Sequence, residues 1–168
     1  RLVDRYDDAL AALDAAQTIA EKNEMTAELS GIHFRRANIF FPLGRIDACL
    51  AEHEEAYRLG QQAGLRDAEA RALGGLGDAY YQRGHMRTAE DNFRRCIALC
   101  RENGFDEIEA ANLNMLANTR AYLLQTGQSA HDYGEAIELT GRLGQQRPHV
   151  IGLMGCHAKL ELGDWAGA

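Results

Sequence analysis

The sequence predicts an all-α protein built as a solenoid of antiparallel helix pairs. Apolar residues recur at intervals of three and four, the spacing of one helical face, as in Leu73, Leu76 and Tyr80. The landmarks of the chain recur after 40 residues, as the turn glycines Gly44 and Gly84 illustrate. Only two prolines occur in the 168 residues, which suits a helical chain because proline lacks the backbone donor. A helix-pair repeat of fixed period predicts an array in which each pair packs on its neighbours.

The clearest repeat occupies residues 70–104. One helical face precedes Gly84, a second follows it, and Gly104 stands where a helix end favours a left-handed residue. The motif residues are Leu76, Gly77, Tyr80, Tyr81, Gly84, Ala89, Phe93 and Cys96. This pattern resembles the tetratricopeptide (TPR) repeat, in the variety with a 40-residue period. The resemblance implies a right-handed superhelix in which each repeat contributes an A helix and a B helix.

Several independent columns of residues agree on the same period. They are the small residues Ala37, Gly77 and Ala117 of the A helices, the rings His53, Phe93 and Tyr133 of the B helices, the small residues Ala16, Ala56, Cys96 and Ala136, and the leucines Leu59, Leu99 and Leu139. We therefore expect one array over residues 1–168: a B helix of a partial repeat over 1–24, repeats over 26–64, 67–104 and 106–146, and a partial repeat over 148–168. Both ends fall inside a repeat, so we expect a longer parent protein.

The third repeat is expected to depart from the pattern. Its turn glycine is predicted to be Gly127, three residues later than the period requires, which would lengthen its A helix by about a turn. Asp106 is predicted to open that A helix with a capping box. The stretch from Ser129 to Asp132 is predicted to cap the following B helix.

Composition excludes several classes of function. The net charge is −7 and the isoelectric point is near 5.3, whereas binding to nucleic acid or an anionic membrane needs a basic surface. The chain has no apolar run long enough to span a bilayer. Three of the four cysteines share columns with small residues and Cys156 falls at or beside one, so we expect buried, reduced thiols and a cytoplasmic protein.

No catalytic constellation is predicted, and we expect neither a cofactor nor a metal. The stretch Gly74-Gly75-Leu76-Gly77 lies inside a predicted helix and lacks the Lys-Ser/Thr of a phosphate loop. His33 and His53 stand in apolar columns and are predicted to face each other as hydrogen-bonded core histidines. Cys156 and His157 are adjacent, so they point to different helix faces.

The resemblance to TPR proteins implies that the A helices line a concave face and that this face binds the partner. The predicted partner-binding residues are Phe34, Asn38, Phe41, Arg71, Asp78, Tyr81, Asn114 and Asn118. Amides and a carboxylate at regular spacing suit the backbone of an extended peptide, and aromatic side chains suit its apolar anchors. A clamp for a C-terminal carboxylate is not expected, because Asp78 would repel that group.

The predicted function is a non-catalytic scaffold that binds a protein or peptide. The alternative is a regulatory or sensor segment of a larger bacterial signalling protein, which binds a small effector or the parent's own ATPase or cyclase domain. Residues 41–54 and 72–81 are similar to the C-terminal repeats of such multidomain regulators. A closed pocket near Arg71, Asp78 and Asn114 would favour a small effector. Self-association through the ends of the array is a third alternative.

Overall fold

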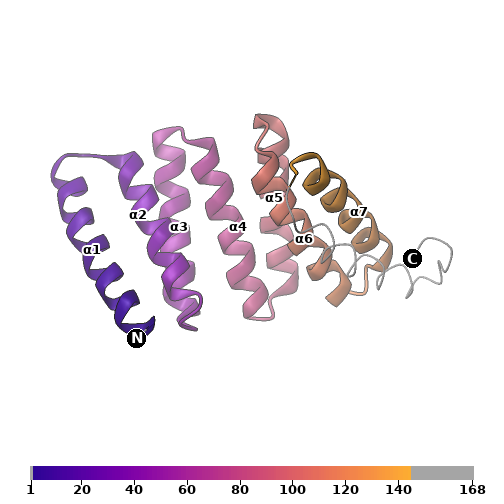
Figure 1. Cartoon of the computed structure of the whole chain (residues 1–168), viewed down its shortest axis with the longest axis horizontal. Coiled ribbons are helices and arrows are strands. Elements are labelled where there is room, and N and C mark those ends of the chain that lie inside the picture. Colours follow the sequence, from indigo (N-terminus) through magenta and orange to yellow (C-terminus); the bar gives the residue numbers. More distant parts are fainter. Residues whose placement is uncertain (1, 145–168) are drawn as a thin grey trace. The chain divides into compact units, whose positions relative to one another are not determined.

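The structure, a computed structural model, describes residues 2–144, with side chains from residue 5 onwards. This part of the chain forms seven α-helices and no strand (Figure 1). The helices are α1 (Leu2–Lys22), α2 (Thr26–Phe40), α3 (Ile46–Ala63), α4 (Arg66–Gln82), α5 (Met86–Asn103), α6 (Asp106–Tyr122) and α7 (Thr126–Arg142). The predicted all-α class is confirmed. The partial repeat predicted over 148–168, with Pro148, Cys156 and His157, lies outside the described residues.

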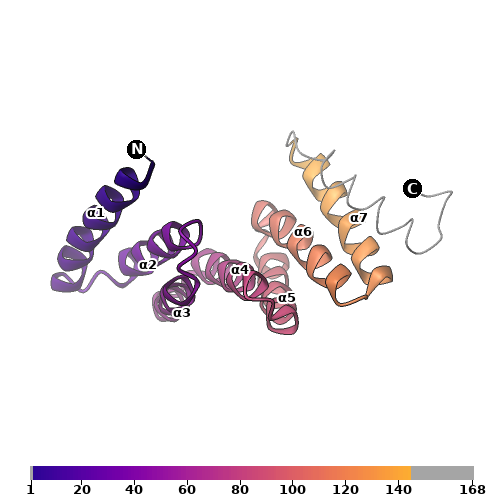
Figure 2. The same ribbon diagram turned by 90° about the horizontal axis from the view of Figure 1, so that it is seen from below.

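The chain divides into two compact units, Arg1–Arg83 and Gly84–Ala168. The first contains α1 to α4, and the described helices of the second are α5 to α7. Successive helices within each unit pack against one another and run antiparallel, as Figures 1 and 2 show from two directions. In the first unit α2 also contacts α4, so its two A helices are neighbours. The unit boundary falls inside the repeat predicted over 67–104, and the single array stays a prediction.

A residue with positive φ recurs every 20 positions along the described chain. These residues are Glu24, Gly44, Gly64, Gly84, Gly104, Leu124 and Gly144. Each lies where one helix has ended, because a left-handed residue lets the chain reverse within a few residues. Glycine adopts this conformation without a Cβ clash, which accounts for its use at five of the seven positions. The 40-residue repeat is therefore two helix-plus-turn segments of equal length.

The prediction of a late turn at Gly127 is wrong. Leu124, with φ of 59°, makes the turn at the position in register with Gly84, and Gly127 lies in the first turn of α7. Helices α4 and α6 have 17 residues each, so α6 gains no extra turn. Sequence reasoning failed because a leucine occupies a site where the backbone favours glycine, and a glycine happens to follow three residues later.

The two predicted caps are also wrong. Helix α6 begins at Asp106 as expected, but no side chain caps its N-terminus. Helix α7 begins at Thr126, ahead of the predicted cap, and the Ser129 hydroxyl instead donates to the Ala117 carbonyl of α6 at 2.9 Å. Ser129 therefore joins two helices and does not start one.

The core of the first unit lies between α2, α3 and α4. Its buried members are Ala37, Phe40, Cys49, Leu50, Leu76 and Ala79. His53 of α3 is also buried, with its ring centroid 5.6 Å from that of Phe34. The imidazole fills the space beside Gly75, where a Cβ would clash with it. Close packing between α3 and α4 thus requires the glycine at this position.

The prediction for the two histidines holds only in part. His53 is buried, but its Nδ1 has no hydrogen-bond partner, so it is not the satisfied core histidine that was expected. Burial lowers the pKa of His53 to about 4, which keeps the ring neutral at neutral pH. His33 bonds instead to Glu52, with Nδ1 and Oε2 2.7 Å apart.

The cysteines of the described residues occupy core positions. Cys49, Cys96 and Cys100 have no exposed surface, which confirms the prediction that they fill small buried sites. Between residues 2 and 144, no helix has the length and apolar composition needed to cross a membrane.

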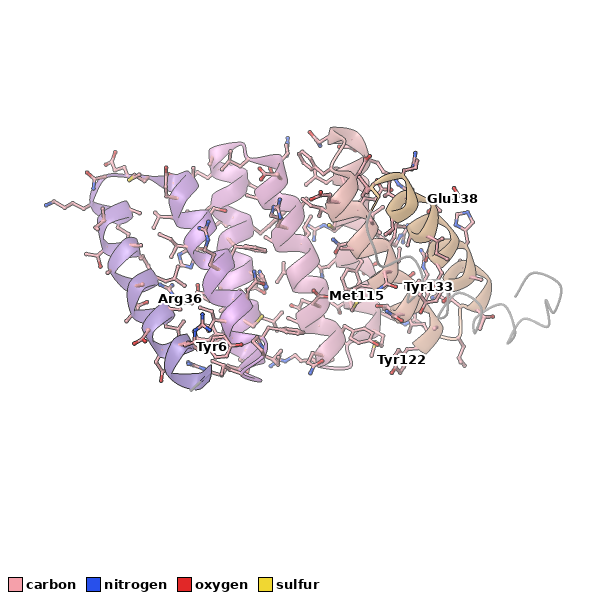
Figure 3. The ribbon with its side chains drawn as sticks, in the orientation of Figure 1. Tyr6, Arg36, Met115, Tyr122, Tyr133 and Glu138 are labelled. Carbon is pink, nitrogen blue, oxygen red and sulfur yellow. The ribbon has the colours of Figure 1, made fainter. Side chains whose placement is uncertain are left out.

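An arginine on the A helix α2 joins both neighbouring B helices of the first unit. The Arg36 guanidinium donates to Asp14 at 2.8 Å and to Gln17 at 2.7 Å, both on α1, and to Glu52 of α3 at 3.3 Å (Figure 3). Arg36 is only 7% exposed. Because a buried guanidinium needs several acceptors in fixed positions, this network sets how the three helices pack.

A second arginine has the same role in the second unit. Arg120 of α6 donates to Glu90 of α5 at 3.1 Å and to both carboxylate oxygens of Asp132 of α7 at 2.9 and 2.7 Å. Both carboxylates are largely buried. Each unit therefore has one A-helix arginine that bridges the B helix before it and the B helix after it.

Replacing Leu124 with glycine is expected to raise the free energy of unfolding by about 1 kcal/mol, because glycine removes the left-handed strain. Urea denaturation followed by circular dichroism measures the change. Gly127→Ala is the companion variant and is also expected to stabilise, by up to about 1 kcal/mol, because Gly127 is helical and a Cβ there meets open space. If Gly127 were the turn residue, alanine would destabilise the chain instead.

Candidate partner-binding face

The structure distributes the predicted binding residues over three A helices and both units. Phe34 and Asn38 lie on α2 and Phe41 follows its last residue, Arg71, Asp78 and Tyr81 lie on α4, and Asn114 and Asn118 lie on α6. Because α2 contacts α4, the first six belong to neighbouring helices of one unit. We call the α2 and α4 members of this set the α2–α4 face.

The polar members of the α2–α4 face differ in their existing side-chain partners, and so in how readily they can bind another molecule. Asn38 is exposed, and no hydrogen bond of its side chain is found among the described residues. Arg71 is also exposed and forms a loose ion pair with Asp67, four residues earlier on the same helix, at 3.9 Å. Such a pair on a helix surface is weak, so the guanidinium can exchange Asp67 for another acceptor at little cost.

The aromatic members contribute to the core as well as to the surface. Phe34 packs on the buried His53, and Phe41 packs against the cluster that contains Phe40 and Leu50. Phe34, Phe41 and Tyr81 each keep part of their surface exposed. Packing therefore fixes the positions of Phe34 and Phe41, and a rigid aromatic surface loses little conformational entropy on binding.

Asp78 is the acidic residue of the α2–α4 face, and burial changes the pKa of its carboxyl. Its Oδ1 atom is inaccessible to solvent and has no hydrogen-bond partner. Burial, with no cation to oppose it, raises the pKa of this carboxyl to about 6. Burial and the nearby Asp78 charge raise the pKa of the Cys49 thiol to about 11, which leaves Cys49 protonated and a poor nucleophile at neutral pH.

In the second unit the two predicted asparagines have different environments. The Asn118 Oδ1 accepts a hydrogen bond of 2.6 Å from the Tyr133 hydroxyl of α7, which is labelled in Figure 3. Asn118 therefore already has a structural role. The Asn114 Oδ1 is buried without a hydrogen-bond partner, as the Asp78 Oδ1 is.

Sequence reasoning missed the two bridging arginines, although the repeat alignment contains a signal for each. Arg36 stands in a column with Leu76 and Leu116, and Arg120 stands in a column with Phe40 and Tyr80. A charged residue in an otherwise apolar column is buried and must find acceptors, so each arginine predicts a partner on an adjacent helix.

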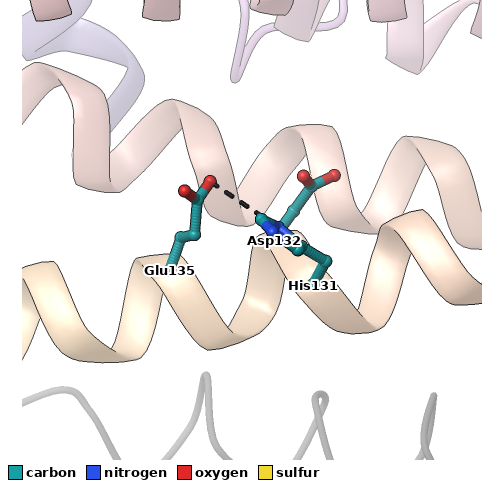
Figure 4. Close-up of side chains that lie close together, drawn as sticks. All are labelled: His131, Asp132 and Glu135. Atoms are coloured by element: carbon teal, nitrogen blue, oxygen red, sulfur yellow. Dashed lines mark ion pairs between the residues drawn. The ribbon is translucent and has the colours of Figure 1, made fainter.

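A group on α7 has the composition of a metal site, and the sequence did not predict it. One ligand atom from each of His131, Asp132 and Glu135 lies within 4.8 Å of the others (Figure 4). Arginines already neutralise both carboxylates, since Arg120 binds Asp132 and Arg101 donates to Glu135 at 2.9 Å. A cation would have to displace two guanidinium groups, so we interpret the group as an ion-pair network.

Two cavities, of about 580 Å³ each, lie away from the α2–α4 face. The first lies between α1 and α2, and residues such as Ile19, Gly31 and Ile32 line it. The second lies in the second unit, where Arg101 and the His131 group line it. Neither is the closed pocket near Arg71 and Asp78 that a small-effector site would have.

Comparison with known families identifies a repeat in the middle of the chain. Residues 26–102 match the family described as the tetratricopeptide repeat. This match confirms the predicted resemblance to the TPR repeat over these residues. The finer resemblance to multidomain bacterial regulators stays a prediction. No curated protein gives a significant sequence match.

Several solved structures share the fold. BtubC (BKLC) from P. vanneervenii is 21% identical, with a TM-score of 0.71 over 86% of this chain and 59% of that one. A Rap protein complexed with competence and sporulation factor is 12% identical, with a TM-score of 0.75 over 98% of this chain and 47% of that one. The Rap conjugation gene regulator of plasmid pLS20, in complex with the Phr* peptide, is 11% identical, with a TM-score of 0.63 over 94% of this chain and 50% of that one.

These likenesses establish a common helical-repeat fold and nothing about function, because sequence identities of 21% or less are too low to transfer a function. The chain spans 47–59% of the length of these structures.

Asp78→Asn is expected to stabilise the chain at neutral pH. The folded pKa of about 6 lies above the ordinary value of 3.8, so the folded chain binds more protons between these pH values. The carboxyl therefore costs stability progressively from pH 3.8 to 6, by about 3 kcal/mol in total, and the cost persists above pH 6. Unfolding of both proteins across this range measures the effect. A constant difference in stability between them would contradict it.

Proposed function

We propose that this chain is a non-catalytic interaction module that binds an extended peptide or partner segment along the α2–α4 face. The contact between α2 and α4 carries this proposal, because it places the exposed Asn38 and the under-coordinated Asp78 on adjoining helices. Two solved neighbours of this fold contain a bound factor or peptide, which makes the fold suited to such a role.

The chemistry of the face suits a peptide backbone. The Asn38 amide offers both a donor and an acceptor, so it can pair with a peptide N–H and C=O together. Phe41 and Tyr81 offer rigid, partly exposed rings for apolar side chains of the partner. A polar ladder with aromatic anchors is the arrangement that binds main chain and selected side chains at once.

The small-effector alternative has less support. Arg71 is exposed, and its nearest partner is Asp67 on its own helix. Neither Arg71 nor Asp78 lines either of the two cavities described above. The buried thiols suit a reducing compartment, so we place the module in the cytoplasm.

Selection of random dodecapeptides displayed on phage against the immobilised chain tests the proposal. We expect peptides to be enriched and to bind the chain in solution, as measured by fluorescence anisotropy. Asn38→Ala is expected to weaken that binding about tenfold, since alanine removes a hydrogen-bonding group at the interface. The Asn38 amide has no hydrogen bond within the described chain, so stability is expected to change little.

The control is Asn23→Ala, an exposed asparagine of the same unit whose side chain bonds only to the Ile19 carbonyl of α1. This variant is expected to leave peptide binding unchanged. Failure to enrich any peptide, or equal weakening by both variants, would contradict binding at the proposed face.

A further inference from the structure

We propose that Asp78 determines which partners bind, by pairing with a cationic group of the bound peptide, an ammonium or a guanidinium. This inference rests on the proposed function, because it names the chemistry that the α2–α4 face selects. The geometry points to it through one exception in how the chain pairs its acidic residues.

Every other buried or half-buried carboxylate among residues 5–144 is paired with an arginine. The pairs are Glu52 with Arg36, Glu55 with Arg58, Glu69 with Arg66, Glu90 and Asp132 with Arg120, and Glu109 and Glu135 with Arg101. Asp78 has no such partner. Within residues 5–144, a cation thus accompanies each carboxylate that is removed from water, except at this one site on the predicted binding face.

The buried groups around Asp78 include no cation that could pair with its carboxylate. Its charge acts on the buried Cys49 thiol, which belongs to the apolar cluster between α2, α3 and α4. Its neighbours in sequence, Gly77 and Ala79, are buried and offer no polar side chain. The pKa of the Asp78 carboxyl is raised because the group is buried without a cationic partner.

A cationic group of a ligand would supply the partner that the Asp78 carboxylate lacks. The Asp78 side chain is half-buried and its Oδ1 is closed to solvent, so a cationic group arriving from solvent would approach the carboxylate at Oδ2. An ionised donor forms the stronger class of hydrogen bond with a carboxylate, and pairing in a partly buried site is screened little by salt. The net charge of −7 adds a general attraction for basic partners.

The test uses the same dodecapeptide selection, run with the full chain and with its Asp78→Asn variant. We expect lysine or arginine to be enriched at one position by the unmodified chain and not by Asp78→Asn. Asp67→Asn is the matched control, because it removes an exposed carboxylate from the same helix. It is expected to select the same peptides as the unmodified chain.

A double-mutant cycle on the best selected peptide then measures the pairing. Replacing its basic residue with norleucine is expected to weaken binding to the unmodified chain by a factor of about ten or more and to change binding to Asp78→Asn little. Acetylation of the peptide N-terminus distinguishes the two sources of cation: a loss on acetylation alone would assign the pairing to the terminal ammonium.

The outcomes separate this inference from the proposed function. Peptides that bind the α2–α4 face without a basic group, or that lose affinity for both chains equally on removal of their cations, would overturn the role of Asp78 and leave the proposed function standing. If no peptide binds, both proposals fail.

Discussion

In each unit, an arginine of an A helix that is largely removed from solvent joins the two B helices beside it. A guanidinium cannot lose its proton in a protein, so once buried it must be surrounded by acceptors in fixed positions. Arg36 takes its acceptors from α1 and α3, and Arg120 takes its acceptors from α5 and α7. Removing the Arg120 guanidinium would leave Glu90 and Asp132 largely buried without a cation, which costs far more than the pair contributes relative to apolar residues. The two networks hold the neighbouring B helices against α2 and α6.

The same need for a partner applies to Asp78, whose carboxylate has none. A chain that pairs its buried carboxylates with arginine keeps one under-coordinated carboxylate on the helix pair whose exposed residues suit a peptide. An unsatisfied charge lowers the stability of the free protein, and a ligand that satisfies it recovers that free energy on binding. Residues that cost stability are common at binding sites for this reason. Asn38, Phe41 and Tyr81 then supply the directional and apolar contacts around it.

Much of the fold follows from the sequence because a repeat offers the same evidence several times. The all-α class, the 40-residue period and the burial of Cys49, Cys96 and Cys100 were all predictable. The turn at Leu124 was not, because the hydrogen-bonded end of α6 requires a left-handed residue there and leucine does not favour that conformation. The arginine networks and the missing partner of Asp78 were not predictable either. They depend on which side chains meet between helices, and a column of the repeat alignment shows only that a residue is unusual.

Chemical-shift mapping by NMR tests the location of the binding face most directly. The ¹⁵N-labelled chain is titrated with a peptide enriched by phage selection, and shifts of the backbone amides are followed. We expect the largest changes to cluster on α2 and α4, around Asn38 and Asp78. Changes centred on the cavity between α1 and α2, near Ile19 and Gly31, or on the ion-pair network of α7 would place binding elsewhere and contradict it.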